Sequence, residues 1–520
     1  MDEKQRAQAV LAALIITPIF CWFVSANIFV GFDQQYAKEQ LSFYVKNTFN
    51  IPPLWGALLF GFVLAIVGSV LFAIFGKATF RGANFNKYYR GSRLVSAFQL
   101  KMLTKENKPQ ITVADVPMPT DAENKHLAIA GATGTGKSTV FREMMLSIIR
   151  RSVPGRREKM IILDPDGDYL SLFYKPGDKI LNPFDARTEG WSFFNEIKKP
   201  FDFERFSKSI VQSSKSSDSE EWNNYGRLLL QAVAKKVYET SRNPSMREVM
   251  RWTNQTSMDE LEAFVTGTAA QAIFAGNERA TSSVRFVLSA KLPPHLKMPE
   301  GDFSLREWIS DPDAGNLFIT WKEGQKEALK PLISAWVDTL ISATLDLSSD
   351  MNRRVWLFID ELESLDNLPT LSDGLTKGRK KGLCCVTGFQ SYAQVVEVYG
   401  ENIAETILSQ HRSLLTLAVG RLGTSTAKRM AQALGEHDVQ RKRAGESSRF
   451  GDLPTTNTNN ENQKEDVVMT SEIFSLPDLE GFLAYPGDLP IARVKFEPIT
   501  FTRTTPVPGL VEIDAMPVRQ

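Results

Sequence analysis

The stretch GATGTGKS, Gly131–Ser138, decides the fold that we expect for this chain of 520 residues. It follows the apolar residues 127–130, matches the pattern G-x-x-x-x-G-K-[ST] and precedes a helical pattern that begins near Thr139. A strand, a glycine-rich loop and a helix in this order form a phosphate-binding loop, because glycines let backbone N–H groups wrap a phosphate and the helix N-terminus attracts negative charge. The sequence therefore predicts a phosphate site in an α/β domain. A glycine turn that arose by chance is the alternative, and a second motif is needed to exclude it.

The residues of this loop have distinct predicted roles. Lys137 would reach the β- and γ-phosphate oxygens, and the Ser138 hydroxyl would bind Mg²⁺. The predicted nucleotide-binding residues are Gly131, Ala132, Thr133, Gly134, Thr135, Gly136, Lys137, Ser138 and Thr139.

The second motif is VWLFIDE, Val355–Glu361, in which an apolar run ends in two adjacent carboxylates. Carboxylates at the end of a buried strand are unfavourable to desolvate without a cation, which favours a metal-binding role over a simple acidic turn. We predict that Asp360 binds Mg²⁺ and that Glu361 polarises the attacking water. The two motifs lie far apart in the chain, so a substantial insert must separate them.

The pattern around these motifs predicts a split α/β domain. Strand-like apolar runs alternate with helical segments, which indicates a largely parallel, doubly wound sheet. These runs are residues 160–163, 317–321, 383–390 and 414–419, with a helix at 328–345. The insert instead has apolar residues at helical spacing, which predicts an all-α domain. Its helical segments are residues 203–211, 220–239, 245–252, 258–274 and 279–291. The polar stretch 436–466 is interpreted as a surface loop.

Two apolar segments near the N-terminus predict transmembrane helices. Residues 9–32 and 54–75 contain no charged residue, and each is long enough as a helix to cross a hydrocarbon core of about 30 Å. A signal peptide cleaved near residues 24–26 is the alternative for the first segment, and a buried core helix is the alternative for the second. We expect two spans, because acidic residues precede the first segment and its apolar run continues beyond the possible cleavage site.

Lysine and arginine residues set the expected orientation of these spans. Between them only Lys38 and Lys46 are basic. Basic residues are more frequent after the second span, and they are Lys77, Arg81, Lys87, Arg90, Arg93 and Lys101. Because positive residues favour the cytoplasmic side, both termini and the large C-terminal part are predicted to be cytoplasmic, with a short loop outside.

Two further candidates for the site follow the second motif. Residues 376–382, TKGRKKG, contain four cations, among them Arg379. Such a cluster is often only a solvated face, but in an oligomeric ATPase a loop arginine can reach the γ-phosphate of the neighbouring subunit. Gln390, at the end of the next predicted strand, would sense the γ-phosphate or position water. An amide that caps the strand end is an equally good interpretation.

The composition is that of an ordinary globular chain. It has 61 Lys+Arg against 60 Asp+Glu, a formal net charge of +1, and 43% hydrophobic residues. These values exclude a disordered chain, a collagen-like chain and a histone-like polycation, but they leave a nucleic-acid partner open, because a basic patch can lie within a balanced total. The three cysteines, Cys21, Cys384 and Cys385, cannot form a disulfide framework, which favours a reducing compartment.

The ordered series of motifs resembles the type IV coupling proteins of bacterial conjugation and type IV secretion, of the TrwB/TraD kind. The resemblance covers nearly the whole chain. Besides the two motifs above, it rests on RGSRLV at 90–95, DPDGD at 164–168, NPFDAR at 182–187, LTKGRKKGL at 375–383 and GFQSYAQVVEVYG at 388–400.

The resemblance implies a RecA-like nucleotide domain, ATP and Mg²⁺ as ligands, and a hexameric ring in which Arg379 acts on the neighbouring subunit. It also implies a bacterial inner-membrane protein that links relaxase-bound single-stranded DNA to the secretion channel and pumps the DNA. The expected division is a transmembrane anchor at 1–76, the RecA-like domain at 77–185 and 298–520, and the all-α domain at 186–297. Because the sequence ends at VEIDAMPVRQ, we do not expect an acidic C-terminal tail to recruit the relaxosome.

Two other functions stay open at this point. One is a chromosome-segregation pump of the FtsK kind, against which the absence of a winged-helix tail and of four spans argues. The other is a receptor that docks the relaxase on the channel, with nucleotide binding in a regulatory role only.

Overall fold

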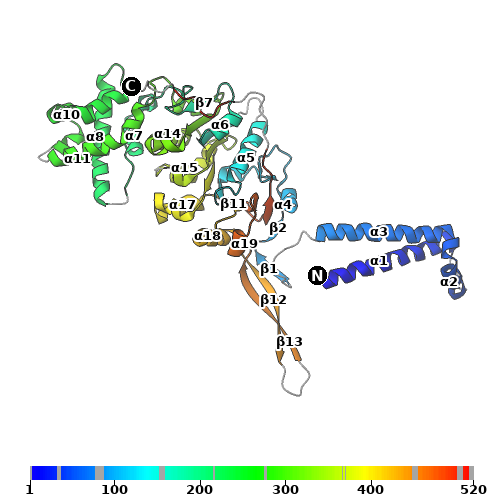
Figure 1. Ribbon diagram of the computed structural model, residues 1–520. Helices are drawn as coiled ribbons and strands as arrows, with labels where there is room; N and C mark the ends of the chain where they lie inside the picture. Colours follow the sequence, from blue (N-terminus) through cyan, green and yellow to red (C-terminus); the bar gives the residue numbers. More distant parts are fainter. Residues whose placement is uncertain are drawn as a thin grey trace, which may run out of the picture. The chain divides into compact units, whose positions relative to one another are not determined.

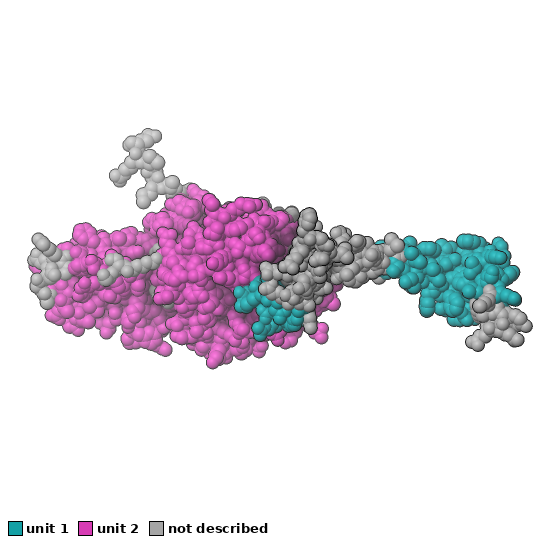
Figure 2. All heavy atoms as spheres, turned by 90° about the horizontal axis from the view of Figure 1, so that it is seen from below, with its two compact units in different colours: residues 1–96, 436–465 teal, residues 97–435, 466–520 magenta. Residues whose placement is uncertain are grey.

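The computed structural model describes residues 3–31, 37–76, 87–151, 158–214, 217–274, 278–365, 367–368, 370–447, 455–499 and 507–513. The chain forms two compact units, which Figure 2 colours separately. The first unit comprises residues 1–96 and 436–465, and the second comprises residues 97–435 and 466–520.

The first unit contains a helical hairpin. Helix α1 (Glu3–Ser25) continues into a π-helical turn, and its return partner is α3 (Pro52–Gly76). The two helices lie side by side in Figure 1. They approach closely at Gly61, where a Cβ atom would lie 2.5 Å from the Cα atom of Pro18. A small residue at this point therefore permits the close helix contact that is common between membrane helices.

The structure supports one of the two predicted spans. Among the described residues, Pro52–Val70 is long and apolar enough to cross a membrane, whereas Ala12–Ile28 forms a shorter apolar helix. The predicted outer loop contains a helix of its own, α2 (Ala37–Lys46). The indole of Trp22 donates a hydrogen bond to Thr48 Oγ1 at 3.2 Å and so ties this connection to α1. The span predicted at residues 9–32 stays a prediction.

The stretch 436–466 is not a loop, so that prediction was wrong. It contains β12 (Glu436–Ser447) and β13 (Thr455–Asp466), and β12 pairs antiparallel with β1 (Lys87–Gly91). The polar composition gave no sign of these strands, because backbone pairing can hold a polar strand in a ribbon without apolar alternation. Its partner β1 also lies far away in the sequence.

The second unit is built on one mixed sheet. Seven of its strands run parallel, from β11 through β7, and β14 and β15 are added antiparallel at one edge. The order is β15-β14-β11-β5-β10-β9-β6-β8-β7. The strands are β5 (Leu127–Ala130), β6 (Lys159–Pro165), β7 (Lys179–Leu181), β8 (Leu317–Trp321), β9 (Val355–Ile359), β10 (Leu383–Phe389), β11 (Ser413–Leu417), β14 (Glu480–Ala484) and β15 (Ile491–Lys495). The largely parallel sheet and its predicted strands are thus confirmed.

Helices flank this sheet and fill the insert. Those along the sheet are α4 (Ala97–Thr104), α5 (Lys137–Arg151), α6 (Asp168–Phe173), α13 (Leu305–Ser310), α14 (Lys326–Asp346), α15 (Leu371–Lys377), α16 (Tyr392–Tyr399), α17 (Glu401–Ser409), α18 (Thr424–Leu434) and α19 (Thr470–Phe474). Those between β7 and α13 are α7 (Asp202–Ile210), α8 (Ser217–Thr240), α9 (Met246–Met250), α10 (Met258–Val265), α11 (Glu278–Lys291) and α12 (Pro293–Leu296). In Figure 1, α7, α10 and α11 gather around α8.

The core of the sheet explains the apolar runs of the sequence. All residues of β5, β8, β9 and β10 are buried, because helices cover the parallel strands. Cys384 and Cys385 are buried in β10 and form no disulfide.

Candidate functional site

The glycine-rich loop lies at the carboxyl end of β5, between its neighbours β10 and β11. Gly131 N donates to Phe389 O at 3.2 Å, and Ala132 N donates to Ala418 O at 2.8 Å, so both flanking strands fix the start of the loop. Gly136 has a φ of 113°, and a Cβ atom there would lie 2.8 Å from Leu479 Cδ2. Only glycine fits this backbone and this close contact.

Lys137 lies at the end of the loop, and its side chain folds back into it. Its Nζ donates to Gly131 O at 2.7 Å and to Ala132 O at 3.3 Å, and the residue is only 7% exposed. Burial lowers the pKa of Lys137, whereas the nearby carboxylates Asp360, Glu363 and Glu361 raise it. A buried ammonium held by two neutral carbonyls can exchange them for phosphate oxygens, which supports the predicted role.

Asp360 follows β9 and meets the loop across the sheet edge. Its Oδ2 accepts hydrogen bonds from Ser138 Oγ at 3.1 Å and from Tyr169 OH at 2.6 Å. Its Oδ1 is buried and has no hydrogen-bond partner among the described residues. Burial raises the pKa of Asp360, and hydrogen bonds from Tyr169 and Ser138 and the charge of Lys137 oppose that rise.

This arrangement fits a magnesium ion. Mg²⁺ binds through one or two protein oxygens together with phosphate and water, and the Ser138 hydroxyl and the free Asp360 oxygen supply such ligands. A buried carboxylate oxygen without a donor is otherwise unfavourable.

Gln390 connects the two motifs. Its Nε2 donates to Glu361 Oε1 at 2.7 Å, and its Oε1 accepts from Thr133 Oγ1 at 3.0 Å. Its backbone N–H donates to Glu363 Oε1 at 2.7 Å. The amide therefore touches both the phosphate loop and the predicted base, which is more than capping a strand end requires.

The sequence interpretation missed Glu363 and Tyr169 at this site. Burial raises the pKa of Glu363, and its Oε2 is a further buried oxygen with no partner in the described part of the chain. The sequence FIDELE, residues 358–363, could have indicated Glu363, because this acid lies only two residues after Glu361. The residue after DPDGD could have indicated Tyr169 only with knowledge of the fold.

Arg379 is the one predicted site residue that lies apart from the others. It is exposed on the short helix Gly378–Lys381, which precedes β10, whereas Lys137 and Asp360 lie at the carboxyl ends of the parallel strands. Asn124 Nδ2 donates to its carbonyl oxygen at 3.4 Å. The amino and carboxyl ends of the parallel strands lie on opposite sides of the sheet. Arg379 therefore does not reach the phosphate loop of its own chain.

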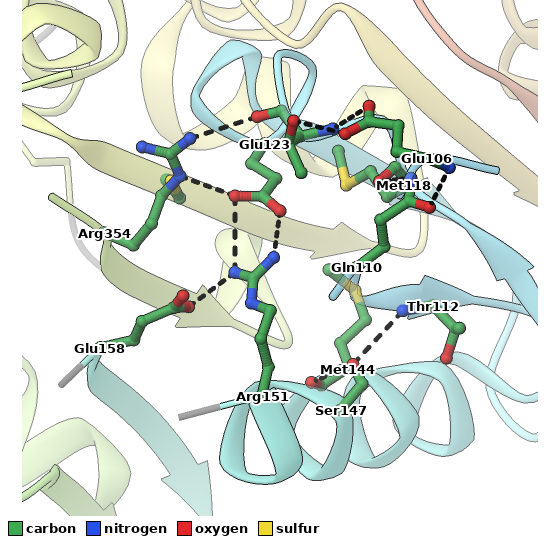
Figure 3. A network of polar contacts seen from close by, with 12 residues as sticks. Glu106, Gln110, Thr112, Met118, Glu123, Met144, Ser147, Arg151, Glu158 and Arg354 are labelled. Carbon is green, nitrogen blue, oxygen red and sulfur yellow. Dashed lines mark hydrogen bonds and ion pairs between the residues drawn. The ribbon is translucent and has the colours of Figure 1, made fainter. Parts of the chain in front are cut away.

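A buried ion network supports the edge that carries Arg379 (Figure 3). Glu123 accepts from Arg354 Nε at 2.6 Å and pairs with Arg151, which also pairs with Glu158 at 2.7 Å. Arg379 and Lys108, with Glu123 and both buried arginines, line a pocket of about 380 Å³ at this edge.

We expect Glu123→Ala to destabilise the protein by about 3–5 kcal/mol, because it leaves two buried guanidinium groups without their shared carboxylate. The free energy of unfolding in urea measures the effect. Asp121→Ala is the control, since Asp121 is 75% exposed and pairs with Lys125 at the surface, where loss of a pair changes stability by at most about 1 kcal/mol. Equal stability of the two variants would contradict a structural role for the network.

Comparison with known proteins places the chain in a family. Residues 110–497 match the family described as the type IV secretion-system coupling protein DNA-binding domain. The chain belongs to this family. The matched range includes the phosphate loop, VWLFIDE, Arg379 and Gln390. The structure of this family member therefore has the α/β fold of a P-loop nucleotide-binding protein.

A curated relative and two solved structures agree with this family. The coupling protein TraD of Escherichia coli (strain K12) is 30% identical over 423 residues, which are 78% of this chain and 57% of TraD. The plasmid coupling protein TrwB in complex with ADP and Mg²⁺ is 46% identical, with a TM-score of 0.77 over 84% of this chain and 100% of that one. TrwB in complex with the ATP analogue ADPNP is also 46% identical, with a TM-score of 0.76 over 83% and 99% of the two chains.

Proposed function

We propose that this family member is an ATP-driven coupling protein of the bacterial inner membrane. It links relaxase-bound single-stranded DNA to a type IV secretion channel and moves the DNA during conjugation. The observation that carries the proposal is the convergence of Lys137, Ser138 and Asp360, with its unpartnered buried oxygen, at one sheet edge. The likeness to TrwB, solved with ADP and Mg²⁺, supports it.

The residues divide the work of ATP hydrolysis among them. The backbone of residues 131–139 holds the phosphates, and Lys137 replaces its two carbonyl partners by phosphate oxygens. Ser138 and Asp360 would hold Mg²⁺, and the bound ion would neutralise charge on the phosphates. Glu361 takes a proton from the attacking water. Gln390 donates a hydrogen bond to Glu361 and accepts one from Thr133, so it connects the base to the phosphate loop and can sense the γ-phosphate.

The active form that we propose is a homo-hexamer with shared sites. Arg379 lies on the opposite sheet edge from its own phosphate loop, as a residue that acts on a neighbour must. A ring repeats one heterologous contact, so each copy can present Arg379 to the next copy's γ-phosphate.

We propose that the chain is a multi-pass membrane protein with both termini in the cytoplasm. Helix α3 supports one span, and α1, which packs along it, is proposed as the other. The proposed division is an anchor at 1–76, a RecA-like domain at 77–185 and 298–520, and an all-α domain at 186–297. A helical hairpin of this kind would hold the motor at the bilayer beside the channel.

The first test is ATP hydrolysis by the full-length chain in lipid nanodiscs, with and without single-stranded DNA, while light scattering follows its mass. We expect Mg²⁺-dependent turnover that rises with DNA as the mass approaches that of six subunits. ATP binding without turnover under every DNA condition would contradict a motor and favour a docking receptor.

A further inference from the structure

Tyr169 makes the shortest hydrogen bond to the predicted metal ligand. Its hydroxyl donates to Asp360 Oδ2 at 2.6 Å, while Ser138 donates to the same oxygen at 3.1 Å. Tyr169 is only 2% exposed. A buried hydroxyl aimed at a carboxylate in the site is either a structural contact or a means of orienting that carboxylate.

The DPDGD turn dictates where Tyr169 lies. Asp164 is the last residue but one of β6. Its two oxygens accept from Tyr169 N at 3.0 Å and Leu170 N at 2.6 Å, so the carboxylate caps the first turn of α6. Asp166 and Gly167 both have positive φ, 63° and 75°, which reverses the chain between strand and helix. The turn thus delivers the residue after the motif to the carboxyl edge of the sheet.

Two further contacts hold this turn and the Tyr169 ring. A Cβ atom on Gly167 would lie 2.4 Å from Gly509 O, so Gly509 packs directly on the turn. Phe141 of α5 lies 6.3 Å from the Tyr169 ring and 5.8 Å from the Phe358 ring of β9. The ring is therefore packed against the helix that follows the phosphate loop, and its hydroxyl has little freedom to leave Asp360.

We propose that Tyr169 is a positioning residue for the metal ligand Asp360: its hydroxyl holds Oδ2 and leaves the unpartnered Oδ1 for Mg²⁺. The inference rests on the proposed Mg-ATP site. A Ser138 hydroxyl that held Mg²⁺ through its oxygen lone pair would still have its proton for Asp360, and the shorter bond from Tyr169 would fix the same oxygen a second time. Mg²⁺ requires nearly ideal octahedral geometry, so a carboxylate with a fixed orientation binds it more tightly than one that rotates.

The test compares Tyr169→Phe with the wild type in the full-length protein. The phenylalanine keeps the packed ring and removes only the hydroxyl. Tyr485→Phe is the matched control, since the Tyr485 hydroxyl is also buried but donates to Val116 O at 3.2 Å, away from the site. The probe is a fluorescent, non-hydrolysable ATP analogue, and its binding is measured first without metal and then as Mg²⁺ is added.

We expect Tyr169→Phe to raise the Mg²⁺ concentration at half-saturation by about 10-fold or more, as outer-shell variants of metal sites do. Affinity for the metal-free analogue stays the same in all three proteins, and Tyr485→Phe retains the Mg²⁺ dependence of the wild type. In ATP hydrolysis, excess Mg²⁺ restores the turnover of Tyr169→Phe.

Two results would overturn the inference while the proposed function stands. One is a Tyr169→Phe variant with the Mg²⁺ dependence of the wild type, and the other is a loss of metal-free binding, which indicates a distorted loop. If the wild type itself shows no Mg²⁺ dependence, the proposed Mg-ATP site fails, and this inference fails with it.

Discussion

The Glu361→Gln variant is expected to bind ATP as tightly as the wild type and to hydrolyse it at least about 100-fold more slowly. Glu361 directly follows Asp360, and Oε1 of Glu361 accepts from Gln390 Nε2 at 2.7 Å. Glutamine has nearly the same size and can still accept that bond through its carbonyl oxygen, but it cannot take a proton from water. The variant therefore separates nucleotide binding from chemistry.

The measurement is a single-turnover assay with a parallel ATP-binding titration. Glu397→Gln makes the same change on the exposed face of α16 and serves as the control. Because the control also removes one negative charge from the chain, a general effect of charge would slow both variants. A Glu361→Gln turnover within about twofold of the control would exclude Glu361 as the base, and Glu363, the other acid that contacts Gln390, would then replace it.

Sequence alone predicts the parallel strands of the fold because their signal is local. Val355–Ile359 and Leu127–Ala130 are apolar throughout and are followed by the two motifs. A continuous apolar run is the pattern expected of a strand that is covered on both faces. The edge pair β14 and β15 and the ribbon of β1 and β12 have weaker patterns, since their pairing depends on distant partners.

The residues of the candidate site likewise fall into two groups, those that a local motif predicts and those that only the fold brings to the site. Lys137, Ser138 and Asp360 belong to motifs whose residue types and spacing predict their chemical roles. The structure brings these three residues together. Tyr169 and Glu363 reach the site because β6 and β9 are neighbours in the sheet. Helix α6 follows β6 and carries Tyr169, whereas the short 3-10 turn Leu362–Ser364 follows β9 and carries Glu363. A linear pattern carries no information about a hydrogen bond between residues 169 and 360, whereas the sheet order does.

Arg379→Ala is expected to reduce DNA-stimulated ATP turnover by about 10³-fold, the scale of an arginine that stabilises transition-state charge. The exposed position of Arg379, on the sheet edge opposite its own phosphate loop, means that the effect must act between subunits. Lys377→Ala is the matched control, because it removes an exposed cation from the same segment, where Lys377 pairs with Asp373 on α15. Steady-state turnover with saturating single-stranded DNA measures both variants.

Mixing two inactive variants tests the shared site directly. In a ring assembled from equal amounts of Arg379→Ala and Lys137→Thr chains, about a quarter of the contacts join an intact phosphate loop to an intact Arg379, because each contact uses one face from each neighbour. Turnover should therefore return in the mixture although neither variant has it alone. If Arg379 acted within its own chain, every site in the mixture would lack one of the two residues, and the mixture would stay as inactive as its components.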